Sequence, residues 1–162
     1  MPHYPLMFTF RDAVSGNGFL AGVTLSGRAL MVHEDDEWWI YGVRPGALAE
    51  TGQTPQEAFL RFRNTYKTVL FDIAGESASF EAFKLEVERF YHEPDEQEES
   101  RWNEAFQDLR SGKVQPDAPF SSLPKEPPET HPSQITVERL DAAGTTRFTA
   151  TDNVPDLYSR AA

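Results

Sequence analysis

The sequence contains no cysteine. Disulfide bonds, thiolate metal sites and cysteine nucleophiles are therefore excluded. Histidine is also sparse, and no two of the four histidines have the i, i+3 or i+4 spacing typical of a pair of metal ligands. We therefore predict no metal site and no cofactor.

Basic side chains are few. The 162 residues include 15 Lys and Arg against 26 Asp and Glu, so the formal net charge is −11. This balance repels nucleic-acid phosphates and anionic membrane surfaces, because binding to either depends on Lys and Arg. A basic partner protein is the complementary inference, although the same charge also has the simpler role of keeping the protein soluble.

Long apolar runs are missing as well. No stretch has the length of a membrane-spanning helix, and the first twelve residues lack the basic and long apolar regions of a signal peptide. We therefore expect a cytoplasmic protein with no membrane association.

The sequence also lacks the usual signatures of catalysis. It has no phosphate-binding loop, no GxSxG motif and no dinucleotide-binding fingerprint. The expected strands over residues 6–14, 19–33 and 38–43 supply only Asp12, too few carboxylates to hold the magnesium ions of a ribonuclease H. We predict no catalytic residue and no enzymatic activity, and an unrecognised hydrolase is the least favoured interpretation.

What the sequence does contain is enough apolar material for one core, because 39% of the residues are hydrophobic and twelve are Phe. The three expected strands alternate apolar and polar residues and are separated by turn clusters at 15–18 and 34–37. Ser26 and Gly27 interrupt the second strand, which is either one bulged strand or two strands joined by a turn; we favour the bulge.

A helix from Thr54 to Ile73 is the clearest local signal. Thr54 can serve as the N-cap, Pro55 suits the first helical position, and Glu57 stands where a capping-box carboxylate belongs. One apolar stripe follows at helical spacing: Phe59, Phe62, Tyr66, Val69, Leu70 and Ile73. The predicted fold class is therefore α+β, with a three-stranded antiparallel sheet and this helix packed on it.

The rest of the chain divides by composition. After the core at 1–76, residues 77–112 are predicted to form a helical pair, the first helix capped by Ser79 and the second beginning at Asp95. Residues 113–134 hold six of the twelve prolines and form a linker or a strap. Residues 135–162 are predicted to contain a β hairpin with arms at 135–141 and 145–151, which pairs with the N-terminal sheet or with another subunit.

Two short patterns in the strand–loop–helix stretch carry a resemblance. They are Tyr41-x-Val43-x-Pro45-Gly46 and Gly52-x-Thr54-x-x-Glu57-Ala58. In this order, behind two strands, they resemble the HicB-like antitoxin family over residues 6–74. The residues themselves have structural explanations: Gly52 permits a loop conformation, Thr54 and Glu57 cap the helix, and Ala58 allows close packing.

The resemblance implies a β-β-β-α core related to part of the RNase H fold, and a protein that blocks a small basic ribonuclease toxin of the HicA type. Gln53 departs from the family, which usually has an acidic residue there. No helix-turn-helix or ribbon-helix-helix is evident in residues 79–162, so DNA binding is not expected. The alternative is an acidic adaptor or assembly protein with this fold and no toxin partner.

Partner contacts are predicted from aromatic and acidic side chains. Tryptophan is frequent at interface hot spots, and carboxylates can steer a basic partner, although the same residue types also serve as core and as a solvated helix start. The candidate partner-binding residues are Trp38, Trp39, Trp102, Glu96, Glu98 and Glu99. The sequence does not define the oligomeric state.

Overall fold

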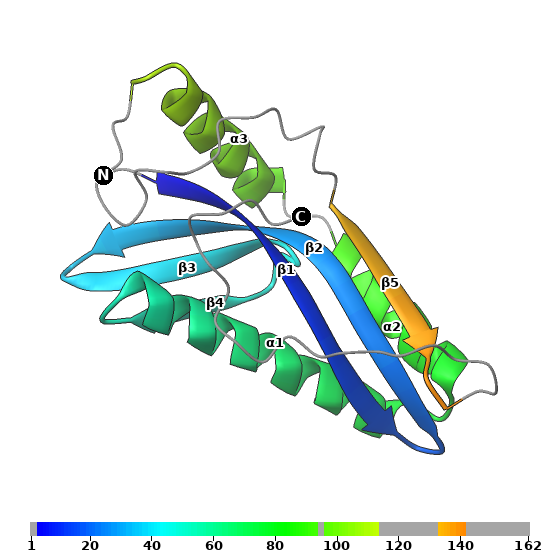
Figure 1. Ribbon diagram of the computed structural model, residues 1–162. Helices are drawn as coiled ribbons and strands as arrows, with labels where there is room; N and C mark the ends of the chain where they lie inside the picture. Colours follow the sequence, from blue (N-terminus) through cyan, green and yellow to red (C-terminus); the bar gives the residue numbers. More distant parts are fainter. Residues whose placement is uncertain (1–2, 94–95, 114–132, 142–162) are drawn as a thin grey trace.

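The computed structural model describes residues 3–93, 96–113 and 133–141, and these form the predicted α+β fold (Figure 1). The sheet has five strands rather than the predicted three, and every pairing within it is antiparallel. The strands are β1 (His3–Gly16), β2 (Phe19–Glu34), β3 (Glu37–Arg44), β4 (Ala49–Gly52) and β5 (Gln134–Arg139). The helices are α1 (Pro55–Glu76), α2 (Phe80–His92) and α3 (Glu96–Arg110).

A long hairpin of β1 and β2 is the framework of the sheet. Its register runs from Gly16 opposite Phe19 to His3 opposite Val32, so the two strands pair over their whole common length. Because side chains alternate between the two faces of a strand, every second residue of each strand lies on the same face. The hairpin therefore supplies two long faces on which helices can pack.

The second edge of β2 is shared between two strands. β3 pairs with residues 28–34 of β2, and β5 pairs with residues 21–26. The register shifts between Arg28 and Ala29, which confirms the predicted bulge in one continuous strand. Gly27 lies between the two pairings, where a Cβ atom would come within 2.5 Å of the Arg44 carbonyl oxygen. A side chain at this position would therefore clash with the end of β3.

β5 shows where the first predicted C-terminal arm lies. It pairs with β2 of the same chain, although more than 100 residues separate the two strands in sequence. The predicted second arm at 145–151 and most of the Pro-rich segment at 113–134 lie outside the described residues.

β4 was not predicted. Its four residues pair with β3, from Trp38 opposite Gly52 to Tyr41 opposite Ala49. The sequence from Ala49 to Gly52 is short and has no apolar alternation, so the pairing depends on β3 being beside it and on α1 following directly. The predicted loop before the helix is thus partly a fourth strand.

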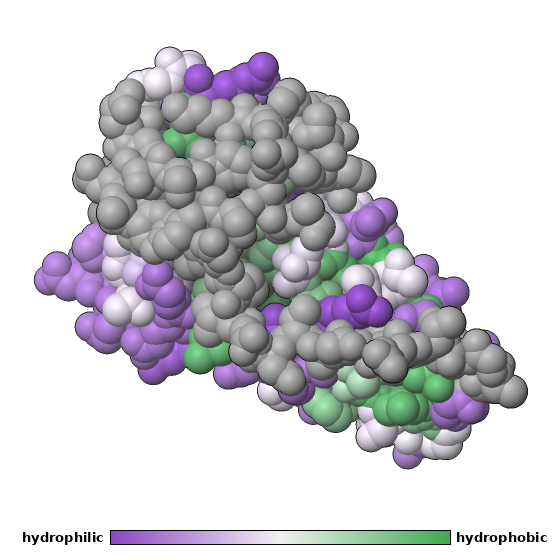
Figure 2. Space-filling model, in the orientation of Figure 1, coloured by the Kyte–Doolittle hydropathy of each residue, from purple (hydrophilic) through white to green (hydrophobic). Residues whose placement is uncertain are grey.

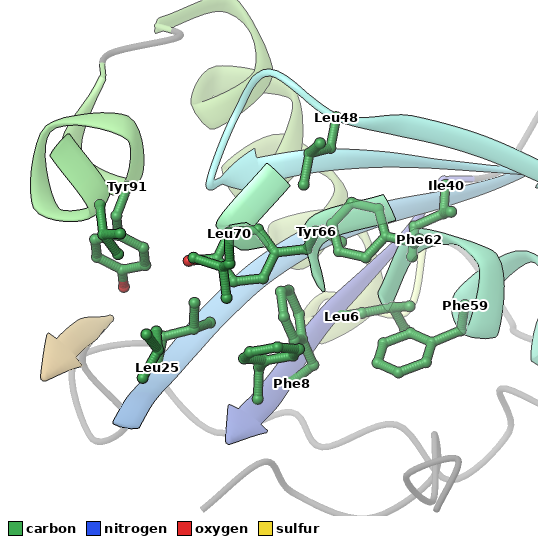
Figure 3. Packing of buried hydrophobic residues seen from close by; sticks show 14 of the residues in the cluster. Leu6, Phe8, Leu25, Ile40, Leu48, Phe59, Phe62, Tyr66, Leu70 and Tyr91 are labelled. Atoms are coloured by element: carbon green, nitrogen blue, oxygen red, sulfur yellow. The ribbon is translucent and has the colours of Figure 1, made fainter. Parts of the chain in front are cut away.

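One face of the sheet is covered by α1 and α2 (Figure 1). Figure 3 shows Phe59 and Phe62 of α1 beside Leu6 and Phe8 of β1. The Phe8 ring lies edge-on to both phenylalanines of α1, with centroid distances of 5.7 Å and 5.5 Å. Four residues of the predicted apolar stripe of α1 are buried, and the other two, Val69 and Ile73, are half-buried. This confirms that the stripe is the face of α1 that packs on the sheet.

The other face carries α3. A second apolar cluster forms there from Leu30, Val43, Trp102, Ala105 and Phe106. Phe83, Val87 and Tyr91 of α2 belong instead to the first cluster. The predicted helical pair at 77–112 is therefore two helices that pack on opposite faces of the sheet.

Candidate functional site

An open pocket of about 330 Å³ lies on the face of the sheet that carries α3. Three strands and one helix contribute to it. Its lining residues are His3, Leu30, Val32, Glu34, Tyr41, Glu98 and Arg101.

The apolar part of the pocket is made by the strands. Leu30 and Val32 are two residues apart on β2, so both point to the same face of the sheet. Tyr41 of β3 stands opposite Leu30, and His3 of β1 stands opposite Val32. The hairpin register and the β2–β3 register together decide which side chains border this pocket.

The wall formed by α3 is held in place by Trp102. Its indole is 1% exposed, and Nε1 donates a hydrogen bond to the carbonyl oxygen of Leu6 at 3.2 Å. Arg44 of β3 forms an ion pair with Glu99 at the start of the helix. These contacts fix α3 across the sheet. Glu98 and Arg101, which directly precede Glu99 and Trp102 in the sequence, therefore line the pocket.

The polar side chains of the pocket include two carboxylates, Glu34 and Glu98, and one guanidinium group, Arg101. Arg101 Nη1 donates to Glu98 Oε1 at 3.0 Å, and Glu34 approaches from the end of β2. Burial raises the pKa of the Tyr41 hydroxyl, and the nearby Glu34 and Glu98 carboxylates raise it further. Tyr41 therefore stays protonated at neutral pH and can donate a hydrogen bond.

The surroundings extend the aromatic and acidic character. The half-buried Trp39 lies parallel to Tyr41, with ring centroids 6.0 Å apart and an interplanar angle of 9°. Asp35 and Asp36 form the β2–β3 turn with positive φ, and both are exposed. Hydrophilic residues cover this end of the molecule, at the left of Figure 2. The arrangement suits a cation with an apolar or planar portion.

The structure separates the predicted partner-binding residues. Glu98 lines the pocket, Trp39 adjoins it through Tyr41, and Glu96 is exposed at the first residue of α3. Glu99 is already engaged by Arg44. These four lie on or near the α3 face.

The other two tryptophans pack against the apolar clusters and do not line the pocket. Trp38 is on the opposite face, where it stacks on His33 at 4.4 Å and packs against the first core cluster. Trp102 is a core residue rather than a partner contact, because its side chain is needed to fill the space between α3 and the sheet. Of the two roles that the sequence allowed for Trp102, partner contact or core, the structure shows burial in the core.

Sequence reasoning missed His3, Glu34, Tyr41 and Arg101 as members of one site. They come from β1, β2, β3 and α3, and no local motif joins them. The available signal was the alternation within the strands. It shows which residues of a strand share a face of the sheet, but it does not show which residues of another strand lie opposite them.

The motif before α1 is structural. Thr54 Oγ1 accepts a hydrogen bond from the Glu57 amide at 3.0 Å, and Glu57 Oε2 accepts one from the Gln53 amide at 3.1 Å. Gly52 does not have a positive φ; a Cβ atom there would lie 2.5 Å from the Ala58 nitrogen. The expected loop conformation is replaced by a close approach between β4 and the first turn of α1.

Pro45 and Gly46 of the same motif lie in the connection between β3 and β4. Pro45 is buried and Gly46 is half-buried. The Gly42 amide donates to the Leu48 carbonyl oxygen at 2.8 Å and closes this connection. These residues shape the link to β4 and do not line the pocket.

Among residues 3–93, 96–113 and 133–141, no three or more His, Asp or Glu side chains are grouped so that they can hold a metal ion. No helix in this part of the chain is both long enough and apolar enough to cross a membrane. Comparison with known proteins found no matching family model, no matching curated protein and no matching solved structure.

Proposed function

We propose that the protein binds a basic protein through the pocket on the α3 face and its acidic rim. The observation that carries this proposal is the placement of Glu34 and Glu98 beside Tyr41, over an apolar floor. A long basic side chain can lay its methylene groups against the half-buried Tyr41 ring and place its charge beside the carboxylates. The net charge of −11 would attract the same partner over a longer range.

The specific role that we propose is that of a HicB-like antitoxin or a diverged relative. The family-like pattern from Tyr41 to Ala58 supports it, as do the acidic surface and the absence of a recognised catalytic motif from the sequence. In this role the acidic surface would cover the RNA-binding face of a small basic ribonuclease toxin in the cytoplasm. An acidic adaptor would use the same surface on a basic partner that has no ribonuclease activity.

The test is affinity capture from the native host with three forms of the full chain. The first is the wild type and the second carries Glu34→Gln and Glu98→Gln. The third carries Asp72→Asn and Glu76→Gln, which make the same charge change at exposed positions of α1. Captured proteins are identified by mass spectrometry and their affinities are then measured with purified components.

We expect a basic protein that is retained by the wild type and by the α1 variant but not by the pocket variant. Its affinity for the pocket variant should fall by at least about tenfold, because a hydrogen bond to a charged group contributes about 1.5–3 kcal/mol. Inhibition of a ribonuclease activity of that protein would support the antitoxin role. Equal binding to all three forms would refute the assignment of the surface.

A further inference from the structure

Arg101 places a guanidinium group at the pocket, on the side of α3. The group pairs with Glu98, three residues earlier on the same helix, and 52% of the Arg101 side chain is exposed. The Glu98 side chain is only 16% exposed, but an ion pair at i, i+3 spacing whose arginine is open to solvent adds little stability. Another cation can therefore replace Arg101 beside Glu98 without a large loss of folding energy.

The remaining lining favours a guanidinium over an ammonium group. A guanidinium is planar, is weakly hydrated, stacks on aromatic rings and can bond two oxygens at once, whereas a lysine ammonium is a compact and strongly hydrated charge. Tyr41 offers an aromatic ring, and Glu34 forms no ion pair with any residue of the described segments. Leu30 and Val32 also line the pocket, but they are only 1% and 4% exposed, so they offer the stem of the side chain a small apolar contact.

The size of the pocket suits a single side chain. Its volume of about 330 Å³ is near the lower bound of roughly 300 Å³ for ligand sites in proteins. A folded segment does not fit in this space, but one extended side chain from a partner surface does.

From these observations we propose that the pocket binds one arginine side chain of the basic partner, and that Arg101 competes with it for Glu98. This inference rests on the proposed function, because it names the group through which the partner is recognised. Arg101 then sets the affinity: while it pairs with Glu98, an incoming arginine must displace it and also meets its positive charge. Removing Arg101 should strengthen binding, although it removes a polar contact from the pocket.

The probe is a set of three blocked tripeptides, with Arg, Lys or the neutral analogue citrulline between two glycines. Each is titrated into the ¹⁵N-labelled full chain and followed by amide chemical shifts. We expect the Arg peptide to produce saturable shifts at Leu30, Tyr41 and Glu98. The Lys peptide should bind about two- to fivefold more weakly, a difference of the size that one exposed ion pair contributes. The citrulline peptide should give no saturable shift.

The variant Arg101→Gln tests the competition, and Arg110→Gln is its control. Arg110 is exposed in the last turn of the same helix, so it provides the same charge change away from the pocket. Arg101→Gln should tighten binding of the Arg peptide by about two- to fivefold, and Arg110→Gln should leave it unchanged. Weaker binding by Arg101→Gln would overturn the competition and would indicate that Arg101 positions Glu98.

The results also separate this inference from the proposed function. Equal affinity for the Arg and Lys peptides, or no saturable shift with the Arg peptide, overturns the arginine site. If the arginine site is overturned but the pocket variant Glu34→Gln, Glu98→Gln fails to retain the basic protein in the capture experiment, the proposed function remains supported without the arginine site. If that variant keeps the protein, the proposed function fails whatever the peptides do.

Discussion

Replacing Gly52 by alanine tests the close contact between β4 and α1. A Cβ atom at this position would lie 2.5 Å from the nitrogen and 3.0 Å from the Cα of Ala58. Both atoms belong to the backbone of α1, so they cannot rotate away, and the helix must move by about 1 Å to reach an ordinary contact of about 3.5 Å. Overpacking of this kind costs about 1–3 kcal/mol.

We therefore expect Gly52→Ala to lower the free energy of unfolding by about 2 kcal/mol. The measurement is urea denaturation followed by tryptophan fluorescence, since Trp38 is paired with Gly52 in the sheet. In a thermal scan, Tm should fall by about 4–8 °C, because 1 kcal/mol corresponds to roughly 2–4 °C in a domain of this size.

The control is the same substitution at Gly75, near the C-terminal end of α1. A Cβ atom there meets nothing within 4 Å. Because glycine is disfavoured inside a helix, Gly75→Ala should raise the free energy of unfolding, by up to about 0.5–1 kcal/mol. The two variants should thus have opposite signs. The packing argument would be refuted if Gly52→Ala left the free energy of unfolding unchanged, or if both variants lowered it equally.

Three further substitutions test other parts of the fold. Trp102→Phe keeps an aromatic ring under α3 but loses the hydrogen bond to the Leu6 carbonyl oxygen, so denaturation should show a loss of about 1–3 kcal/mol. Ser79→Ala removes the N-cap of α2, whose hydroxyl accepts an amide hydrogen bond at 3.2 Å, and should cost about 1 kcal/mol in the same assay. Burial raises the pKa of Tyr91 from 10.0 to about 12, so the folded state holds this proton more tightly than the unfolded state. The contribution of this proton to the free energy of unfolding is complete below pH 10 and is lost between pH 10 and 12. Tyr91→Phe should therefore flatten the loss of stability over that range. At neutral pH the same substitution should cost about 1 kcal/mol, because the hydrogen bond to the Ser26 carbonyl oxygen is lost.

Each of these expectations can fail in a defined way. Unchanged stability of Trp102→Phe would mean that the indole nitrogen contributes nothing across the sheet. A loss for Ser79→Ala no larger than that for Ala78→Gly, one residue before the cap, would contradict the capping role. If Tyr91→Phe loses stability between pH 10 and 12 as steeply as the wild type, the alkaline transition belongs to other groups.

Local interactions explain what the sequence could predict. The cap of α1 needs only Thr54 and Glu57, three residues apart, and its apolar stripe follows from helical periodicity. The long strands follow from alternation, as with Leu6, Phe8 and Phe10 on one face of β1. The bulge near Gly27 was also visible, because glycine breaks a regular apolar pattern.

Pairing between distant segments could not be predicted in the same way. β4 becomes a strand only beside β3. The composition of β5 predicted a strand, but it left open whether that strand pairs with the N-terminal sheet or with another subunit, since a short segment does not specify its own neighbour. The burial of Trp102 depends on Leu6, 96 residues away, and the apolar face of α3 does not state which face of the sheet it covers.

The candidate site shows the same division. The sequence by itself determined an acidic chain, three long strands and a capped helix. Net charge follows from composition, and strand alternation and helix capping depend on residues only a few positions apart. Only the tertiary structure brought His3, Glu34, Tyr41 and Arg101 to one pocket, because strand register and the placement of α3 join residues that have no local relation.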